Sequence, residues 1–105
     1  MLANQALKDA WILALRSGKY TKGKRQFKTS NGAYCCLGVL CMVLKHPEWI
    51  HGTRQKVDNY VALRRESGLT TAETDKLGHI NDYGGDSELT FQQIADYIEQ
   101  HITSV

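Results

Sequence analysis

The stretch of sequence that decides the fold is Tyr34-Cys35-Cys36-Leu37-Gly38-Val39-Leu40-Cys41-Met42-Val43-Leu44, the most apolar run in the chain. From Cys36 to His46 the apolar residues recur at helical spacing and cover nearly the whole circumference of the predicted helix. Pro47 ends the pattern, because the residue before a proline avoids helical geometry. A helix that is apolar all round lies at the centre of a core or is shared with a second subunit, and we expect the core.

The segment before this run predicts an amphipathic helix over Ala3–Ser17. Asn4 is its candidate N-cap, and Trp11 lies on its narrow apolar face. Gly18 stands where a residue of left-handed conformation commonly ends a helix. The sequence therefore marks both the start and the end of this helix.

The residues between the two predicted helices form a basic, non-helical segment. Lys19–Lys28 contains Gly23 and has no helical period, which indicates an extended, exposed arm or an edge strand. Asn31-Gly32 is a strong signal for a two-residue hairpin turn. We therefore expect Arg25–Thr29 to pair with Ala33–Cys35 in a small β-hairpin.

Two capping-box patterns mark helix starts in the second half of the chain. Thr70 with Glu73, and Thr90 with Gln93, each place a hydroxyl and a longer polar side chain three residues apart. The stretch Asn81–Ser87 consists almost entirely of turn formers. The helices predicted in this half cover residues 60–66, 71–79 and 91–100.

Length and composition limit the class of protein. With 105 residues, 42% of them hydrophobic and 23% charged, the chain is expected to form a single domain over residues 1–105. The predicted fold class is α+β, mainly α, with about four helices and one small β-hairpin. The longest apolar stretch, Ala33–Leu44, is shorter than the roughly 18 residues that a membrane-spanning helix needs.

The cytoplasm is the expected location, without contact to a membrane. Lys8 and Asp9 interrupt the region where a secretory leader needs an unbroken apolar core. The chain has three cysteines, an odd number. Cys35 and Cys36 are neighbours whose side chains diverge, so we expect reduced thiols rather than a disulfide framework.

Charge is distributed very unevenly along the chain. Residues 1–47 contain eight Lys and Arg against one acid, a balance of +7, whereas residues 48–105 contain five against ten, a balance of −5. Six of the cations fall between Arg16 and Lys28 with no acid among them. Their mutual repulsion is not relieved locally, which favours an anionic partner for this segment.

Phosphate binding needs cations, unobstructed backbone amides and, for a nucleotide, an aromatic face. The basic segment supplies all three, with Gly18 and Gly23 as points of close approach. It is not a Walker A loop, because no Gly-Lys-Ser/Thr opens a helix. The alternative is a solvated basic loop that only keeps the protein in solution. The candidate ligand-binding residues here are Arg16, Lys19, Tyr20, Lys24, Arg25, Phe27 and Tyr34.

Cys35 and Cys36 are candidates for a nucleophile. A thiol at a helix N-terminus beside cations has a lowered pKa, which favours the reactive thiolate. A base would also be needed, and spacing selects none of the four histidines. The alternative is that both are small core residues, which we favour, so no catalytic residue is assigned.

The turn-rich stretch after residue 80 supplies the last candidates. Asn81 and Asp82 either hydrogen-bond the backbone of a turn, which we favour, or contact the polar edges of a ligand. The stretch lacks the ligand spacing of an EF-hand, and the chain has no Cys-x-x-Cys or paired-histidine motif. We therefore expect neither a metal nor a cofactor.

Three segments resemble a group of short phage and prophage proteins. The matching residues are Trp11 with Ala14-Leu15-Arg16-Ser17-Gly18-Lys19-Tyr20, then Tyr34-Cys35-Cys36-Leu37-Gly38-Val39-Leu40-Cys41, and finally Ile80-Asn81-Asp82 with Phe91 and Ile94-Ala95-Asp96-Tyr97-Ile98-Glu99. Residues 48–69 and 83–89 depart from the pattern. The group is uncharacterised, so the resemblance implies a phage-type accessory protein and no activity; proteins of this kind are often counter-defence factors, including sponges for nucleotide immune signals.

These observations favour a binding protein over an enzyme. The leading hypothesis is a counter-defence protein that sequesters a small phosphorylated ligand, a nucleotide-derived immune signal, without turnover. A closed pocket in so small a chain often forms between two subunits, so we expect a homo-oligomer. The alternatives are a nucleic-acid-binding accessory protein, a phosphodiesterase-like or cysteine-dependent hydrolase, and a protein that binds a host protein through its acidic half.

Overall fold

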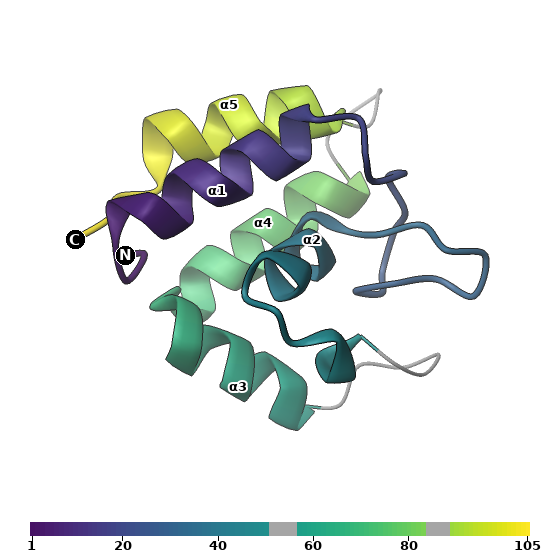
Figure 1. Ribbon diagram of the computed structural model, residues 1–105, viewed down its shortest axis with the longest axis horizontal. Helices are drawn as coiled ribbons and strands as arrows, with labels where there is room; N and C mark the ends of the chain where they lie inside the picture. Colours follow the sequence, from purple (N-terminus) through teal and green to yellow (C-terminus); the bar gives the residue numbers. More distant parts are fainter. Residues whose placement is uncertain (51–56, 84–88) are drawn as a thin grey trace.

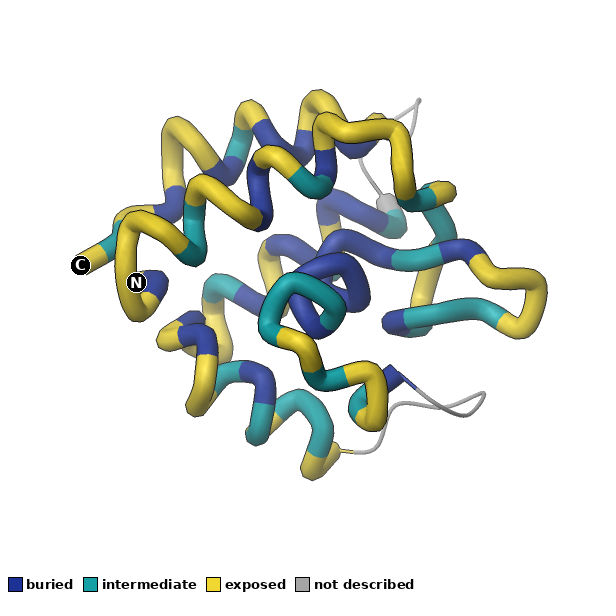
Figure 2. The backbone as a smooth tube through the Cα atoms, viewed as in Figure 1, coloured by how far each residue is buried: buried dark blue, intermediate teal, exposed yellow. Residues whose placement is uncertain are grey.

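The apolar stretch forms α2 (Cys36–Val43) at the centre of the molecule in the computed structural model, which describes residues 1–50, 57–83 and 89–105 (Figure 1). All six residues from Cys36 to Cys41 are buried, as the dark blue central coil of Figure 2 shows. A helix buried all round needs no polar face, so its sequence carries none. The prediction that this segment belongs to the core is confirmed.

Two antiparallel helices, α1 (Gln5–Arg16) and α5 (Phe91–His101), lie side by side along one edge of the molecule (Figure 1). The Asn4 side chain accepts a hydrogen bond from the backbone N–H of Leu7 at 2.7 Å, so it is the N-cap of α1. Trp11 is fully buried between α1 and α2, and its indole N–H donates to the carbonyl oxygen of Cys36 at 2.9 Å. The indole therefore joins the helix to the centre of the core without an unsatisfied donor.

The remaining helices are the short 3₁₀ helix η1 (Pro47–Trp49), α3 (Val57–Ser67) and α4 (Thr71–Tyr83). Fully buried Leu77 anchors α4 against α2. This helix is longer than predicted and includes Asn81 and Asp82, which the sequence placed in a loop; residues 84–88 lie outside the described part of the chain. Within the described ranges, no helix combines the length and the apolar character needed to cross a membrane.

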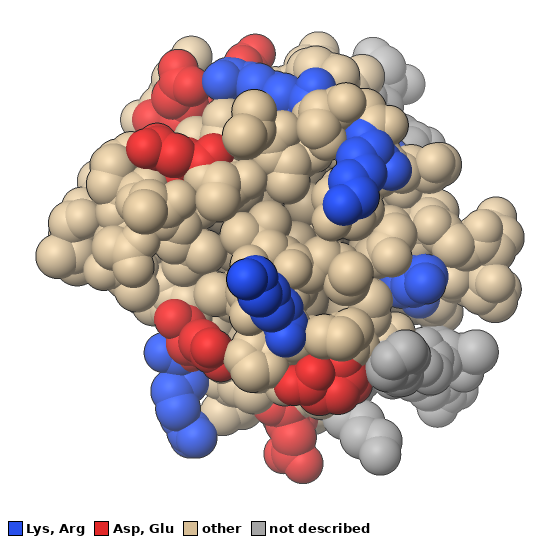
Figure 3. Space-filling view, viewed as in Figure 1, with Lys and Arg blue, Asp and Glu red and all other residues tan. Residues whose placement is uncertain are grey.

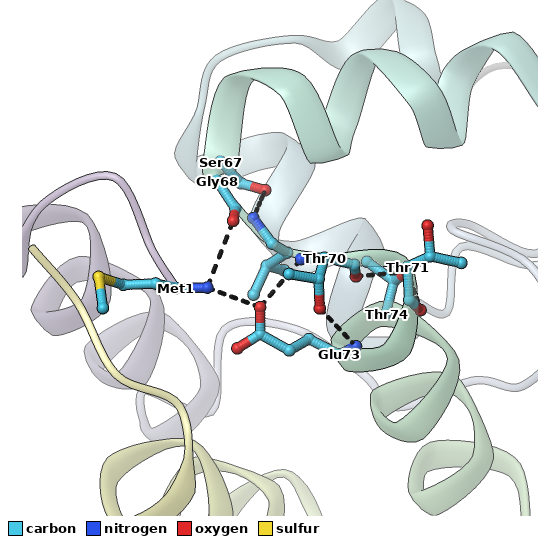
Figure 4. Close-up of polar contacts among 8 residues, drawn as sticks. Met1, Ser67, Gly68, Thr70, Thr71, Glu73 and Thr74 are labelled. Atoms are coloured by element: carbon cyan, nitrogen blue, oxygen red, sulfur yellow. Dashed lines mark hydrogen bonds and ion pairs between the residues drawn. The ribbon is translucent and has the colours of Figure 1, made fainter.

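The first residues of the chain connect α3, α4 and the C-terminal residues. Figure 4 shows the α-amino group of Met1, which contacts Glu73 Oε1 at 2.7 Å and the carbonyl oxygen of Gly68 at 3.4 Å. Glu73 also completes the predicted capping box, because Thr70 N–H donates to its carboxylate while Glu73 N–H donates to the Thr70 hydroxyl. Partial burial opposes ionisation of Glu73, but these contacts hold its pKa below the ordinary value.

The prediction of an α+β fold with a β-hairpin is wrong. The described residues form five α-helices, and the segments expected to pair are joined by a single isolated bridge, between Lys28 and Tyr34. The turn at Gly32 does form, with φ +86°, but α2 begins at Cys36 and leaves too few residues for a ladder. On the other side, Arg25 has φ +67° and interrupts the extended chain. The protein is therefore all-α in its described part.

Candidate functional site

The basic segment between α1 and α2 is not a free arm, because it folds around the backbone of Tyr34. The Tyr34 N–H donates to the carbonyl oxygen of Thr21 at 2.7 Å, and Gly23 N–H donates to the Tyr34 carbonyl oxygen at 2.6 Å. On the opposite side, Cys35 N–H donates to the carbonyl oxygen of Phe27 at 3.2 Å. Residues well separated in the segment are therefore brought to either side of Tyr34.

Two tyrosines and two lysines gather where the segment folds back. The rings of Tyr20 and Tyr34 pack edge to face with their centroids 5.0 Å apart. Lys19 Nζ lies 5.5 Å from the centroid of the Tyr20 ring, and Lys28 Nζ lies 5.4 Å from that of Tyr34. Both rings are half-buried. These four groups follow one another at the surface: the Lys19 ammonium, the Tyr20 ring, the Tyr34 ring and the Lys28 ammonium.

A hollow of about 230 Å³ adjoins these groups. Tyr20 and Lys22 line it together with Gly18, the end of α1 and the first turn of α5. The Lys22 ammonium donates to the carbonyl oxygen of Asn81 at 2.7 Å, which anchors this side chain to α4. We call Lys19, Tyr20, Lys22, Lys28 and Tyr34 the tyrosine–lysine surface.

Asn81 and Asp82, which lie on α4, hydrogen-bond the segment that carries this surface. Asn81 is fully buried; its amide oxygen accepts from the Cys36 N–H at 3.1 Å, and its amide nitrogen donates to the Gly23 carbonyl oxygen at 2.9 Å. The Asp82 carboxylate accepts from the Arg25 N–H at 3.0 Å. Both side chains therefore bond backbone groups, but from a helix and across to the basic segment and α2, not within a turn of their own as the sequence led us to expect.

Arg16 lies apart from the tyrosine–lysine surface. Its guanidinium bonds Asp96 at 2.7 Å and Glu99 at 3.0 Å, both on α5. These two hydrogen bonds raise the pKa of Arg16 further above its ordinary value. Its charge is therefore balanced within the chain, by acids from the opposite half.

The other candidates are divided between core and surface. Phe27 is buried, with its ring 4.8 Å from that of Tyr60, so it presents no face to a ligand. Lys24 and Arg25 are exposed in the same segment as the tyrosine–lysine surface. Of the nine residues chosen from the sequence, Lys19, Tyr20 and Tyr34 come together directly.

Two members of the surface, Lys22 and Lys28, were not among the residues chosen from the sequence. Both form isolated backbone bridges with Tyr34, one parallel and one antiparallel. Their place follows from the fold around Tyr34, which linear spacing does not reveal. The signal that was available is their membership in the acid-free basic run.

The cysteines are core residues. Cys35, Cys36 and Cys41 are buried, and burial raises the pKa of the Cys35 thiol to about 12 and that of Cys36 well above its ordinary value. Both thiols are therefore protonated near neutral pH, which removes the nucleophilic form. Cys35 instead caps α2, since its sulfur accepts from the Gly38 N–H at 3.4 Å.

Positive charge does not form one continuous face on the side of the molecule that Figure 3 shows. On this side, Lys and Arg side chains lie in separate groups with other residues between them, and acids lie close to some of these groups. The candidate site is therefore a local cluster. Across residues 1–50, 57–83 and 89–105, no group of three or more His, Cys, Asp or Glu side chains has an arrangement that would hold a metal ion.

The fold and this cluster define a small helical protein with a local basic and aromatic surface. A family model described as a domain of unknown function (DUF8296) matches residues 3–82, and the chain belongs to this family. The match includes the whole tyrosine–lysine surface and ends before α5. No curated protein and no solved structure matches the chain.

Proposed function

We propose that this protein binds a small phosphorylated ligand at the tyrosine–lysine surface and holds it without turnover. The observation that carries the proposal is the contact of Tyr20 with Tyr34, flanked by the ammonium groups of Lys19 and Lys28. Ammonium groups attract phosphoryl oxygens, and tyrosine rings stack on nucleobases. A nucleotide offers both partners in one molecule.

The hollow beside Tyr20 supports this proposal and limits the size of the group that enters. Its walls combine the apolar side chains of Leu15 and Phe91 with the polar groups of Lys22 and Thr90, a mixture typical of small-molecule sites. Its volume of about 230 Å³ is below the roughly 300–1,000 Å³ of sites that enclose a whole drug-sized ligand. Part of the ligand would enter the hollow, and the rest would lie over the rings.

The biological role that we propose is counter-defence in the cytoplasm of an infected or lysogenic bacterial host. The ligand would then be a nucleotide-derived immune signal, removed from its receptor by tight binding. This role draws on the resemblance to short phage and prophage proteins and on the ligand chemistry of the tyrosine–lysine surface.

A thermal-shift screen tests the proposal. The probes are inorganic phosphate, AMP, cyclic AMP, a cyclic dinucleotide and a short single-stranded oligonucleotide. A ligand that binds only the folded state raises the apparent Tm by mass action, so we expect a rise with at least one nucleotide. The double variant Lys19→Gln/Lys28→Gln should lose most of this rise, because both flanking charges are gone.

The matched control is Lys45→Gln/Lys76→Gln, which removes two exposed charges elsewhere. With the nucleotide, the apparent Tm of this control variant should rise as much as that of the wild type. Absence of a rise with every probe, or an equal loss in both double variants, would contradict the proposal.

The dependence of affinity on salt concentration distinguishes binding of a small ligand from binding of nucleic acid. Affinity for a nucleic-acid backbone falls steeply with salt, because one counterion is released for each phosphate neutralised. We expect a shallow slope, corresponding to one or two phosphates. A steep slope with the oligonucleotide, together with no response to mononucleotides, would instead identify a nucleic-acid-binding protein.

A further inference from the structure

The turn at Asn31-Gly32, which the proposed function does not use, places an exposed side-chain amide beside an exposed backbone nitrogen. Ser30, Asn31 and Gly32 are all exposed. Gly32 has φ +86°, and a Cβ atom built at this residue would meet no atom within 4 Å. The space beside Gly32 is therefore open, and the residue has no side chain of its own to hinder an approach to its nitrogen.

Thr29 organises this turn and polarises the Asn31 amide. The Thr29 hydroxyl donates to Oδ1 of Asn31, and the Ala33 N–H donates to the same hydroxyl at 3.0 Å. A donor on a carbonyl oxygen stabilises the negative charge that develops on that oxygen when a nucleophile attacks the carbon. The hydrogen bond from Thr29 therefore makes Cγ of Asn31 more electrophilic.

One hydrogen bond opposes an attack on this carbon by the Gly32 nitrogen. The Gly32 N–H donates to the carbonyl oxygen of Thr29 at 3.0 Å, and this bond must break before the nitrogen turns towards the Asn31 side chain. A single hydrogen bond contributes little net stability at an exposed turn, so it slows the attack by about tenfold or less. The fold delays this approach without preventing it.

The other three asparagines of the chain are engaged elsewhere and precede residues with side chains. Asn4 caps α1 through its side-chain oxygen, and Nδ2 of Asn59 donates to a backbone carbonyl oxygen of η1 at 3.1 Å. Asn81 is fully buried, with both of its amide atoms hydrogen-bonded. Only Asn31 precedes a glycine. The structure thus distinguishes Asn31 from every other asparagine of this chain.

We propose that Asn31 is a site of spontaneous deamidation, a covalent modification whose only other reactant is water. The Gly32 nitrogen, after losing its proton to hydroxide, attacks Cγ of Asn31. The N–Cγ bond forms, the Cγ–Nδ2 bond breaks, and Nδ2 takes up a proton and leaves as ammonia. Water then opens the cyclic succinimide at either carbonyl carbon, which gives aspartate or isoaspartate, and nothing is oxidised or reduced.

The product introduces a carboxylate close to a stretch that contains no acid. Six cations and no acid lie between Arg16 and Lys28, and Asn31 follows three residues later. The formal net charge of the chain falls by one, from +2 to +1. Isoaspartate also carries the main chain through the side-chain carbon, which lengthens the turn between Lys28 and Tyr34. Deamidation therefore changes both charge and backbone length next to the tyrosine–lysine surface.

Incubation of the folded protein in mildly alkaline buffer tests the proposal, with a peptide of residues 27–34 as the reference without a fold. Ion exchange should resolve a growing species with one positive charge fewer. Peptide mapping by mass spectrometry should place the change at residue 31, as aspartate and isoaspartate. We expect the folded chain to react at a rate within about tenfold of that of the peptide. A folded chain that stays unmodified while the peptide reacts would overturn the proposal.

Substitution locates the reaction in the chain. Asn31→Gln should stop the appearance of the less basic species, because glutamine must close a larger ring and reacts far more slowly. The matched control Asn59→Gln should react at the rate of the wild type, and circular dichroism should show native helix content in both variants. A charge change that persists in Asn31→Gln, or one that maps to Asn59 or Asn81 in the wild type, would contradict the assignment.

Discussion

At the scale of single residues, Gly38 lets α2 approach the backbone of Phe27 closely. A Cβ atom at this position would lie 1.8 Å from the carbonyl oxygen of Phe27. The same oxygen accepts the Cys35 N–H, and Cys35 caps the helix through its sulfur. This segment therefore performs packing and capping, and any residue larger than glycine at position 38 would push α2 away from the chain beside it.

Gly38→Ala should destabilise the protein by at least about 2 kcal/mol, because backbone must move to relieve the contact. Urea unfolding measures this as a lower midpoint. The matched control is Gly78→Ala in α4, where a Cβ would meet no atom within 4 Å. That change should stabilise the helix by about 0.5–1 kcal/mol. A Gly38→Ala variant as stable as the wild type would show that α2 does not approach Phe27 this closely.

Lys45 occupies a position that favours glycine. Its φ is +64°, and Lys45 N–H donates to Met42 O while His46 N–H donates to Cys41 O, both at 3.0 Å, which is a Schellman motif. Lys45→Gly should raise the free energy of unfolding by about 1 kcal/mol, because it removes the left-handed strain. Lys45→Ala keeps the Cβ and should give no gain. Equal Tm values for the glycine and alanine variants would argue against strain at this residue.

Sequence patterns predicted some residue roles at the site and missed others. Tyr20, Tyr34 and Lys19 come together as members of one short segment. Phe27 was expected to be exposed because the segment around it is basic, yet packing against Tyr60 buries it. Arg16 pairs with α5, a contact across the length of the chain that no local pattern encodes.

At the scale of elements, helices with a clear cap were the most predictable. Asn4 and the capping boxes at Thr70 and Thr90 all form the hydrogen bonds expected of them. The prediction of a β-hairpin was wrong because the turn signal at Asn31-Gly32 specifies only the turn. Strand pairing also needs several extended residues after the turn, and α2 already begins at Cys36. Local signals thus predict where elements begin, and competition between neighbouring elements decides how far they extend.

His46 connects three elements and makes their connection dependent on pH. Its Nδ1 lies 2.6 Å from Glu48, its Nε2 lies 2.9 Å from Glu66 on α3, and its ring stacks on Trp49. The hydrogen bond to Glu48, then that to Glu66, raises the pKa of His46. The resulting stability is fully present below the unfolded-state pKa, about 6.5, and is lost as pH rises through the higher pKa of the folded state.

The urea midpoint of the wild type should therefore fall, relative to that of His46→Gln, as the pH rises above about 6.5. The control is His101→Gln, since His101 is exposed at the end of α5 and forms no ion pair within the described residues. The urea midpoint of this control variant should change with pH in parallel with that of the wild type. Parallel curves for the wild type and His46→Gln would exclude the two carboxylates as the source of pH dependence.

At the scale of the whole molecule, folding brings the basic and acidic halves of the chain together. Arg16 bonds two acids of α5, and the Arg25 N–H bonds Asp82 of α4. The ion pairs of Arg16 relieve part of the imbalance of +7 and −5 along the sequence inside the molecule, whereas the Arg25 contact uses an uncharged backbone N–H. Under the proposed function, the ligand would meet a smaller set of cations, which the fold around Tyr34 holds beside two aromatic rings.

The most direct test of binding at the tyrosine–lysine surface is a map of backbone amide chemical shifts during titration with AMP, with inorganic phosphate as the comparison. We predict that the largest changes occur in residues 19–28 and at Tyr34, and that phosphate alone perturbs fewer of them. Changes centred on α3, or none at saturating AMP and at saturating cyclic dinucleotide, would contradict the assignment of this surface as the ligand site.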